Sequence, residues 1–277
     1  FTTRGVVYQL KGYQIPESGR TAKGTAIVNL LPLESDEKVT AMIPISEFEE
    51  GNYLTFITKN GTIKKTNIMD YSRIRTSGLR AIELAEDDEL IRVELTNNEQ
   101  DIIVGTHDGM SIRFNENDVR PMGRTARGVR AIKLHEDDYV VGACIAESGS
   151  KLLAVTESGY GKKTELDEYK VQTRGGKGIL TYKITEKTGK LAGIKTVTDE
   201  DDIMLITSDG IVIRMASDEI STYGRQTQGV RLMRLDDGVQ VVSVTVTEKM
   251  EETEDQPEND EPAENTQEVQ NETDESV

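Results

Sequence analysis

Thr58-Lys59-Asn60-Gly61 is one copy of the motif that decides the fold, in which an apolar run ends in Thr and is followed by two residues and a Gly. The other copies are Thr106–Gly109, Thr156–Gly159, Thr207–Gly210 and a truncated one at Thr2–Gly5. The motif glycines at positions 5, 61, 109, 159 and 210 lie 56, 48, 50 and 51 residues apart. Asn-Gly and Asp-Gly pairs between strand-like runs predict β-hairpins whose two central residues both take positive φ. The sequence thus predicts a hairpin that repeats at this spacing.

A second recurring element is a basic turn that ends in Gly. Its copies are Arg20–Gly24, Arg75–Gly78, Arg124–Gly128, Arg174–Gly178 and Arg225–Gly229. Four and six residues beyond each of these glycines stands an apolar pair, at the period-two spacing of a strand with one buried face. The pairs are Val28/Leu30, Ile82/Leu84, Ile132/Leu134, Tyr182/Ile184 and Met233/Leu235. Each basic turn is therefore predicted to lead into a strand that contributes to the core.

An acidic turn follows this predicted strand in four of the five copies. The acidic turns are Asp36-Glu37, Asp87-Asp88, Asp137-Asp138 and Asp236-Asp237, with Thr188-Gly189 replacing the acidic pair in the fourth copy. At ~3.3 Å per residue, the two turns of one repeat are predicted to lie roughly 20–40 Å apart, at opposite ends of a strand. Radial stacking of the repeats would then gather cations on one rim and carboxylates on the other.

Units of about four short strands at this period predict an all-β fold of the β-propeller class. A series of separate small β domains is disfavoured, because a single blade cannot bury a core and no flexible linker separates the copies. We therefore expect one domain over residues 1–247, with an incomplete first blade. Its predicted repeats are near 1–15 (partial), 16–71, 72–119, 120–169, 170–220 and 221–247.

Charge is unevenly distributed along the 277 residues, whose formal net charge is -17. Residues 248–277 contain 13 acidic residues and one Lys, a net of -12, and their few aliphatic side chains predict a disordered acidic tail. The remaining 32 basic and 37 acidic residues give the body a net charge of -5. No apolar run is long enough to cross a membrane. The lone Cys144 excludes an intramolecular disulfide and fits a reducing cytoplasm.

A body with nearly balanced charge presents a positive surface only where its cations are gathered. A single Lys or Arg in a surface turn is more often solvated than bound, but cations at one equivalent turn in five repeats favour a phosphate-binding band. The candidate DNA-binding residues are Arg20, Lys23, Arg73, Arg75, Arg80, Arg120, Arg124, Arg127, Arg130, Lys170, Arg174, Lys177, Arg225 and Arg231. Nothing resembles a recognition helix, so sequence-tolerant binding of double-stranded DNA is expected.

Few residues suggest other chemistry. The segment Gly159–Thr164 superficially resembles a phosphate-binding loop, but Thr156 stands where the first Gly of such a loop belongs, and a strand follows instead of a helix. His135 precedes three acidic residues, yet no second His or Cys lies at ligand spacing. We therefore predict no catalytic residue, metal ligand or cofactor site in this chain.

Several stretches resemble the C-terminal domain family of the DNA gyrase A subunit. The resemblance covers residues 1 to about 247 and is carried by Arg4–Tyr8, Arg20–Gly24, Ile27–Leu33, Asn60–Thr66 and Gly159–Thr164. It implies a six-bladed propeller variant, the β-pinwheel, in which neighbouring blades exchange strands and the rim wraps DNA. It also implies ATP-dependent negative supercoiling in the bacterial cytoplasm, by an assembly of two A and two B subunits. The catalytic Tyr, the ATP site and Mg²⁺ of that assembly would lie outside this chain.

One departure concerns the family's diagnostic heptapeptide, Gln-(Arg/Lys)-Arg-Gly-Gly-(Lys/Arg)-Gly. Gln172–Gly178 fits at six of seven positions but stands at the basic turn of a late repeat, so the motif itself is expected upstream of Phe1. The C-terminal domain of the topoisomerase IV A subunit, which lacks a strict heptapeptide, stays open as an alternative. A protein-interaction propeller of the WD or kelch kind is disfavoured, because the chain has no Trp and the basic turns would go unexplained.

Overall fold

The computed structural model describes residues 1–19 and 22–249, whose regular elements are short β-strands and six 3-10 helices. The helices are η1 (Gly12–Gln14), η2 (Ile27–Asn29), η3 (Ile68–Tyr71), η4 (Glu116–Asp118), η5 (Leu166–Glu168) and η6 (Ser217–Glu219). The predicted all-β fold is confirmed. Arg20 and nearly all of the predicted acidic tail, residues 250–277, lie outside the described residues.

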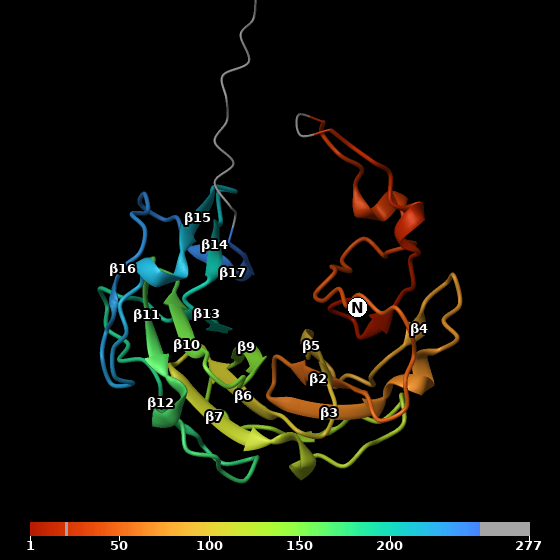
Figure 1. Cartoon of the computed structure of the whole chain (residues 1–277), viewed down its shortest axis with the longest axis horizontal. Helices are drawn as coiled ribbons and strands as arrows, with labels where there is room; N and C mark the ends of the chain where they lie inside the picture. Colours follow the sequence, from red (N-terminus) through yellow and green to blue (C-terminus); the bar gives the residue numbers. More distant parts are fainter. Residues whose placement is uncertain (20–21, 250–277) are drawn as a thin grey trace, which may run out of the picture.

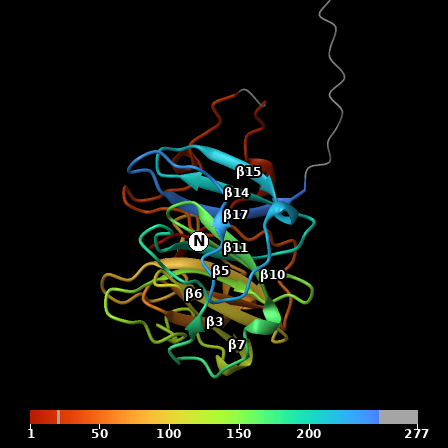
Figure 2. The same ribbon diagram turned by 90° about the vertical axis from the view of Figure 1, so that its left-hand side faces the viewer.

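Antiparallel sheets follow one another along the chain, and three of them have the predicted four strands. In hydrogen-bonded order, the first sheet contains β1 (Val6–Val7) and β4 (Leu79–Arg80), and the second contains β5 (Leu90–Thr96), β2 (Tyr53–Thr58), β3 (Thr62–Asn67) and β8 (Val129–Arg130). The third contains β9 (Val140–Ile145), β6 (Asp101–Thr106), β7 (Met110–Asn115) and β12 (Ile179–Leu180), and the fourth contains β13 (Leu191–Val197), β10 (Lys151–Thr156), β11 (Tyr160–Glu165) and β16 (Val230–Arg231). The last contains β17 (Val241–Glu248), β14 (Asp201–Thr207) and β15 (Val212–Ala216). Figure 1 shows them arranged in an arc, and the side view of Figure 2 shows the last sheet, with β14, β15 and β17, above β3, β6 and β7.

The outermost strand of each four-stranded sheet comes from farther along the chain, beyond the next hairpin. In the β3–β8 pair, Arg130 lies opposite Thr62 and Val129 opposite Ile63, and β12 and β16 add to β7 and β11 in the same way. The strand exchange that the family resemblance implies is confirmed. The hydrophobic core is correspondingly divided into clusters that lie between consecutive sheets, so each blade is stabilised by its neighbours.

The ring is open, as the incomplete first blade predicts. The first sheet has two strands, and the sheet β17–β14–β15 has no outer fourth strand among the described residues. The first repeat and the last sheet face each other across the opening at the top of Figure 1.

The hairpin turns differ from the prediction in their backbone. Gly61 takes a φ of 77°, but Asn60 is not among the described residues with positive φ. The Gly61 N–H donates to the Thr58 carbonyl (3.0 Å), and strand pairing ends at Ile57 and Ile63. The connection is therefore a type I turn followed by a left-handed Gly, a geometry that three-residue hairpin loops use. The predicted turn with two positive φ angles is wrong.

The segment after each basic turn is buried, but it is not one continuous strand. β4 spans two residues, and Ile82 (1% exposed) lies beyond it. The Ala81 N–H donates to the Gly5 carbonyl (2.8 Å), and a Cβ added to Gly5 would lie 2.7 Å from the Ile82 side chain. Equivalent contacts recur in later repeats. The predicted burial of Val28 is wrong: it is 58% exposed and lies in the 3-10 helix η2, which has no buried residue, rather than in a strand.

Candidate nucleic-acid interface

Four of the basic turns lie directly before the outermost strand of the preceding sheet. β4, β8, β12 and β16 each begin at the residue after the terminal Gly of a turn. These turns therefore occupy equivalent positions along the outer edge of the arc (Figure 1). We call the four of them the basic rim: Arg75–Gly78, Arg124–Gly128, Arg174–Gly178 and Arg225–Gly229.

Close backbone contact fixes the terminal Gly of these turns. Gly128 has a φ of 103°, and an added Cβ would lie 2.5 Å from the carbonyl oxygen of Ile63. Gly alone adopts positive φ readily, and the contact leaves no room for a side chain. Gly178 and Gly229 approach the preceding hairpin in the same way. One end of each turn is thus anchored on the preceding repeat.

Most of the predicted DNA-binding cations have exposed side chains. The exposed ones are Lys23, Arg73, Arg75, Arg80, Arg120, Arg127, Arg130, Lys170, Lys177 and Arg231, while Arg124, Arg174 and Arg225 are half-buried. Lys23 belongs to the first basic turn, which leads into η2 rather than into an outermost strand of a sheet. The structure therefore brings together the cations of the four rim turns and their flanks, but not those of the first turn.

Two of the half-buried arginines also hold the rim in place. Arg174 donates from Nε to the Asp118 carbonyl (2.9 Å) and from Nη1 to the Arg130 carbonyl (3.0 Å). Arg225 donates from Nη1 to the Leu180 carbonyl (2.8 Å). Part of the hydrogen-bonding capacity of these two side chains is therefore used within the protein rather than offered to a ligand.

Acidic residues lie closer to the rim than predicted. One surface hollow is lined by Glu83 and Asp88 together with Arg127 and Arg130. The Glu83 N–H donates to the Ala126 carbonyl (3.3 Å), so this basic turn packs on the segment that leads to the acidic turn of the preceding repeat. The predicted separation of the two charge signs onto opposite rims is wrong here, because strand exchange brings neighbouring repeats into register.

Four buried lysines near the rim were not predicted. Lys64 and Lys65 in β3 and Lys162 and Lys163 in β11 are at most 2% exposed. Burial lowers the pKa of Lys64 and of Lys162 to about 8. Consecutive residues of a strand point to opposite faces, so two lysines in a strand buried on both faces must each find internal partners. The two consecutive lysines in a short hairpin strand are the sequence signal from which these buried side chains could have been predicted.

Gly159–Thr164 forms a hairpin turn that runs into β11, as predicted, rather than a loop before a helix. In the part of the chain that the structure describes, no group of three His, Cys, Asp or Glu side chains could hold a metal ion. Among the same residues, no helix has the length and apolarity that crossing a membrane requires.

Sequence comparison places this architecture among known domains. A family model described as "DNA gyrase C-terminal domain, beta-propeller" matches residues 1–46, 52–97, 100–143, 150–198 and 201–248. The DNA gyrase A subunit of Halalkalibacterium halodurans is 61% identical over 244 residues, which cover 88% of this chain and 29% of that protein. The DNA gyrase A subunit of Streptococcus pneumoniae serotype 4 is 56% identical over 255 residues, 92% of this chain and 31% of that protein. The chain thus spans less than a third of the length of these curated relatives.

Solved structures with the same fold include the C-terminal domain of DNA topoisomerase IV, with a TM-score of 0.82 and 29% identity over 90% of this chain and 78% of that one. The structure of a DNA gyrase A C-terminal domain gives a TM-score of 0.77 and 25% identity, over 88% of this chain and 80% of that one. Both likenesses agree with the propeller fold that the family model describes.

Proposed function

Because the chain belongs to the DNA gyrase C-terminal domain family, we propose that its basic rim binds double-stranded DNA and bends it around the outer edge of the arc. The observation that carries the proposal is the equivalent placement of four cationic turns, each directly before an outermost strand. Cations at regular intervals along a convex edge suit the phosphate backbone. No α-helix occurs among the described residues to enter the major groove, which favours sequence-tolerant binding.

The curvature of the arc supports wrapping rather than straight binding. Bending DNA over tens of base pairs costs on the order of several kcal/mol of elastic energy, and many phosphate contacts offset this cost. The exposed cations Arg73, Arg120 and Lys170 precede the rim turns in sequence and would widen the contact.

Within the whole protein, the domain would serve a type IIA topoisomerase that introduces negative supercoils using ATP. We infer that this chain needs no cofactor, and that ATP and Mg²⁺ act at sites in other parts of an assembly of two A and two B subunits. The compartment would be the bacterial cytoplasm. The high structural similarity to a topoisomerase IV domain keeps that enzyme as the second candidate, but the 61% identity to a gyrase A subunit favours gyrase.

A linking-number measurement tests the wrapping proposal. Nicked circular DNA is closed by ligase with increasing amounts of the chain, and the linking number of the deproteinised circles is compared with that of circles closed without it. We expect a shift that grows with bound protein and disappears as salt rises, because each neutralised phosphate adds about 0.9 to the slope of log K against log salt. Binding without any linking-number shift would reject wrapping, and absence of binding would reject the whole proposal.

A further inference from the structure

Two buried lysines lie beneath two turns of the basic rim. Lys64 in β3 and Lys162 in β11 are both 0% exposed. Each stands three residues after a motif glycine, Gly61 or Gly159, so the two occupy the same position in different repeats. Neither residue was among the predicted DNA-binding cations, because neither side chain reaches the surface.

The ammonium groups of these lysines donate hydrogen bonds mainly to backbone carbonyl oxygens in or beside the rim turns. Lys162 donates from Nζ to the carbonyl oxygens of Gly224 (2.7 Å) and Arg225 (2.6 Å) and to Thr227 Oγ1 (3.2 Å). All three acceptors belong to one turn or to the residue directly before it. The ammonium therefore fixes the start of that turn from the protein side.

Lys64 makes the corresponding contacts with the turn Arg124–Gly128. Its Nζ donates to the carbonyl oxygens of Arg124 (2.6 Å), Gly123 (3.4 Å) and Ala81. The first carbonyl groups of both turns therefore point inward, toward a buried ammonium group. The arginine side chains of each turn thus lie over a buried positive charge.

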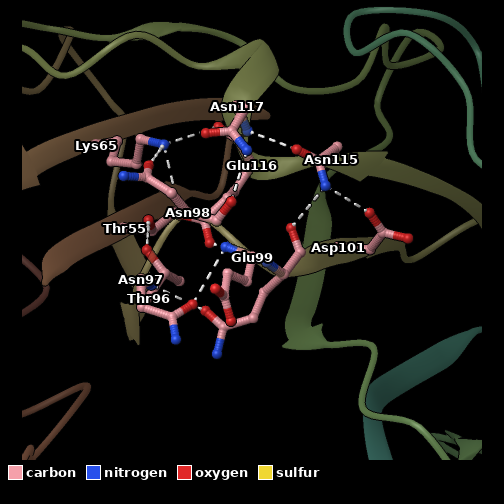
Figure 3. A network of polar contacts seen from close by, with 11 residues as sticks. Thr55, Lys65, Thr96, Asn97, Asn98, Glu99, Asp101, Asn115, Glu116 and Asn117 are labelled. Carbon is pink, nitrogen blue, oxygen red and sulfur yellow. Dashed lines mark hydrogen bonds and ion pairs between the residues drawn. The ribbon is translucent and has the colours of Figure 1, made fainter. Parts of the chain in front are cut away.

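The neighbouring lysines show that this arrangement is specific to one face of the hairpin. Figure 3 shows Lys65 directed toward Asn98 and Glu116, where its Nζ lies 2.7 Å from Asn98 Oδ1 and 3.4 Å from Glu116 Oε2. Lys163 pairs with Asp199. These two lysines are neutralised by carboxylates. In the described part of the chain, Lys64 and Lys162 form no ion pair, and their Nζ atoms donate to carbonyl and hydroxyl oxygens instead.

Burying an ammonium group without a carboxylate partner is costly, and an apolar side chain of similar volume often serves stability as well or better. Ile112 occupies the equivalent position in the third hairpin, where the turn Arg174–Gly178 is instead held by the side chain of Arg174. The fold therefore accepts an apolar residue at this position. The charge at the other two positions calls for an explanation other than packing.

We propose that Lys64 and Lys162 are positioning residues of the basic rim, which hold the turns Arg124–Gly128 and Arg225–Gly229 in their DNA-binding conformation and add positive potential beneath them. This inference rests on the proposed function. Charges in a poorly solvated interior are screened less than surface charges, so a buried ammonium group contributes to the field that a phosphate meets above the turn.

The variants Lys162→Met and Lys163→Met, made in the full chain, test the proposal. Met keeps the unbranched apolar stem, and both changes remove a fully or almost fully buried ammonium group from adjacent residues of β11. We expect both variants to fold, because Ile112 already occupies the position of Lys162 in the third hairpin. Only Lys162→Met is expected to weaken duplex binding, by about tenfold at 0.1 M salt, and to reduce the salt slope by about one phosphate contact.

Equal loss of DNA affinity in the two variants, or none in Lys162→Met, would overturn the inference. If the unmodified chain does not bind duplex DNA at all, the proposed function itself is rejected, and with it the inference that rests on it. The pair Lys64→Met and Lys65→Met repeats the test in another repeat, with the same expected difference.

A pH profile of the unmodified chain gives a readout that does not depend on how well a variant folds. Burial is the main cause that lowers the pKa of both lysines to about 8, and the charged groups acting on them are Asp70 and Arg124 at Lys64 and Glu168 and Arg225 at Lys162. Carboxylate and guanidinium groups as classes keep their charge between about pH 7 and 9. The positive charge of the lysines is therefore lost as pH rises through this range.

Duplex affinity is accordingly expected to fall between about pH 7 and 9 in the unmodified chain and to stay nearly level in the double variant Lys64→Met/Lys162→Met. The same decline in both proteins, or no decline in the unmodified chain, would contradict the positioning role.

Discussion

Replacing Arg124, Arg127 and Arg130 together by Ala is expected to weaken duplex binding by about two to three orders of magnitude at 0.1 M salt. All three belong to one rim turn or the strand it leads into, and Arg127 and Arg130 are exposed. Loss of three phosphate contacts reduces the slope of log K against log salt by up to about 2.7. Titration of a labelled duplex at several salt concentrations measures both quantities.

The matched control removes three cations that do not belong to the rim turns. Lys38→Ala, Lys151→Ala and Lys190→Ala together change the net charge equally, and Lys151 and Lys190 form ion pairs with Asp199 and Asp108. If this control reduced the slope as much as the arginine variant does, the binding would follow overall charge and the rim would have no special part in it.

The variant Gly128→Ala is expected to lower the free energy of unfolding by about 3 kcal/mol, from backbone strain and steric overlap together. Its φ of 103° is unfavourable for any residue with a side chain, and the added Cβ would lie 2.5 Å from the Ile63 carbonyl oxygen. To relieve the overlap, β8 has to move away from β3 and weaken the exchanged contact between repeats. Urea unfolding measures the loss.

Gly210 provides the comparison, since its φ of 88° is similar but no atom lies within 4 Å of its hypothetical Cβ. Gly210→Ala is expected to cost only about 1 kcal/mol, from the backbone conformation alone. Equal losses in the two variants would mean that the close approach to the preceding repeat contributes nothing to stability.

The repeat architecture could be predicted because each unit carries the same local signals. Residues equivalent to Gly61, Gly128 and the apolar Ile132 recur at the spacing of a blade, so the repeat can be recognised even where one copy deviates from the pattern. The turn type at Asn60–Gly61 could not be predicted with the same success, because two-residue and three-residue hairpin loops share the Asn-Gly signal. Only the backbone hydrogen bond from Gly61 to Thr58 distinguishes them.

Errors in the candidate site have one physical origin. The sequence was interpreted as if each repeat formed its own blade, whereas β8 leaves its repeat to complete the preceding sheet. Because of this exchange, Arg127 lines one surface hollow together with Asp88 of another repeat, and Lys64 finds an acceptor at Arg124, 60 residues away in the chain. Contacts of that separation leave no local pattern, so the partners of buried cations are determined by tertiary structure alone.

The most direct test of the central claim uses cross-linking from single cysteines. The only native thiol is that of Cys144, which is buried, and burial raises its pKa to about 12, so it stays unreactive. A photoreactive group is attached to Thr125→Cys, Thr173→Cys or Gln226→Cys in or beside three rim turns, and to Glu99→Cys, Glu147→Cys or Glu200→Cys in the loops that join β5 to β6, β9 to β10 and β13 to β14, at the end of the sheets opposite the hairpin turns. The cross-linked fraction of a labelled duplex is then measured. The rim positions should all cross-link efficiently and the other three only at background level, whereas equal yields from both sets would contradict DNA binding along the basic rim.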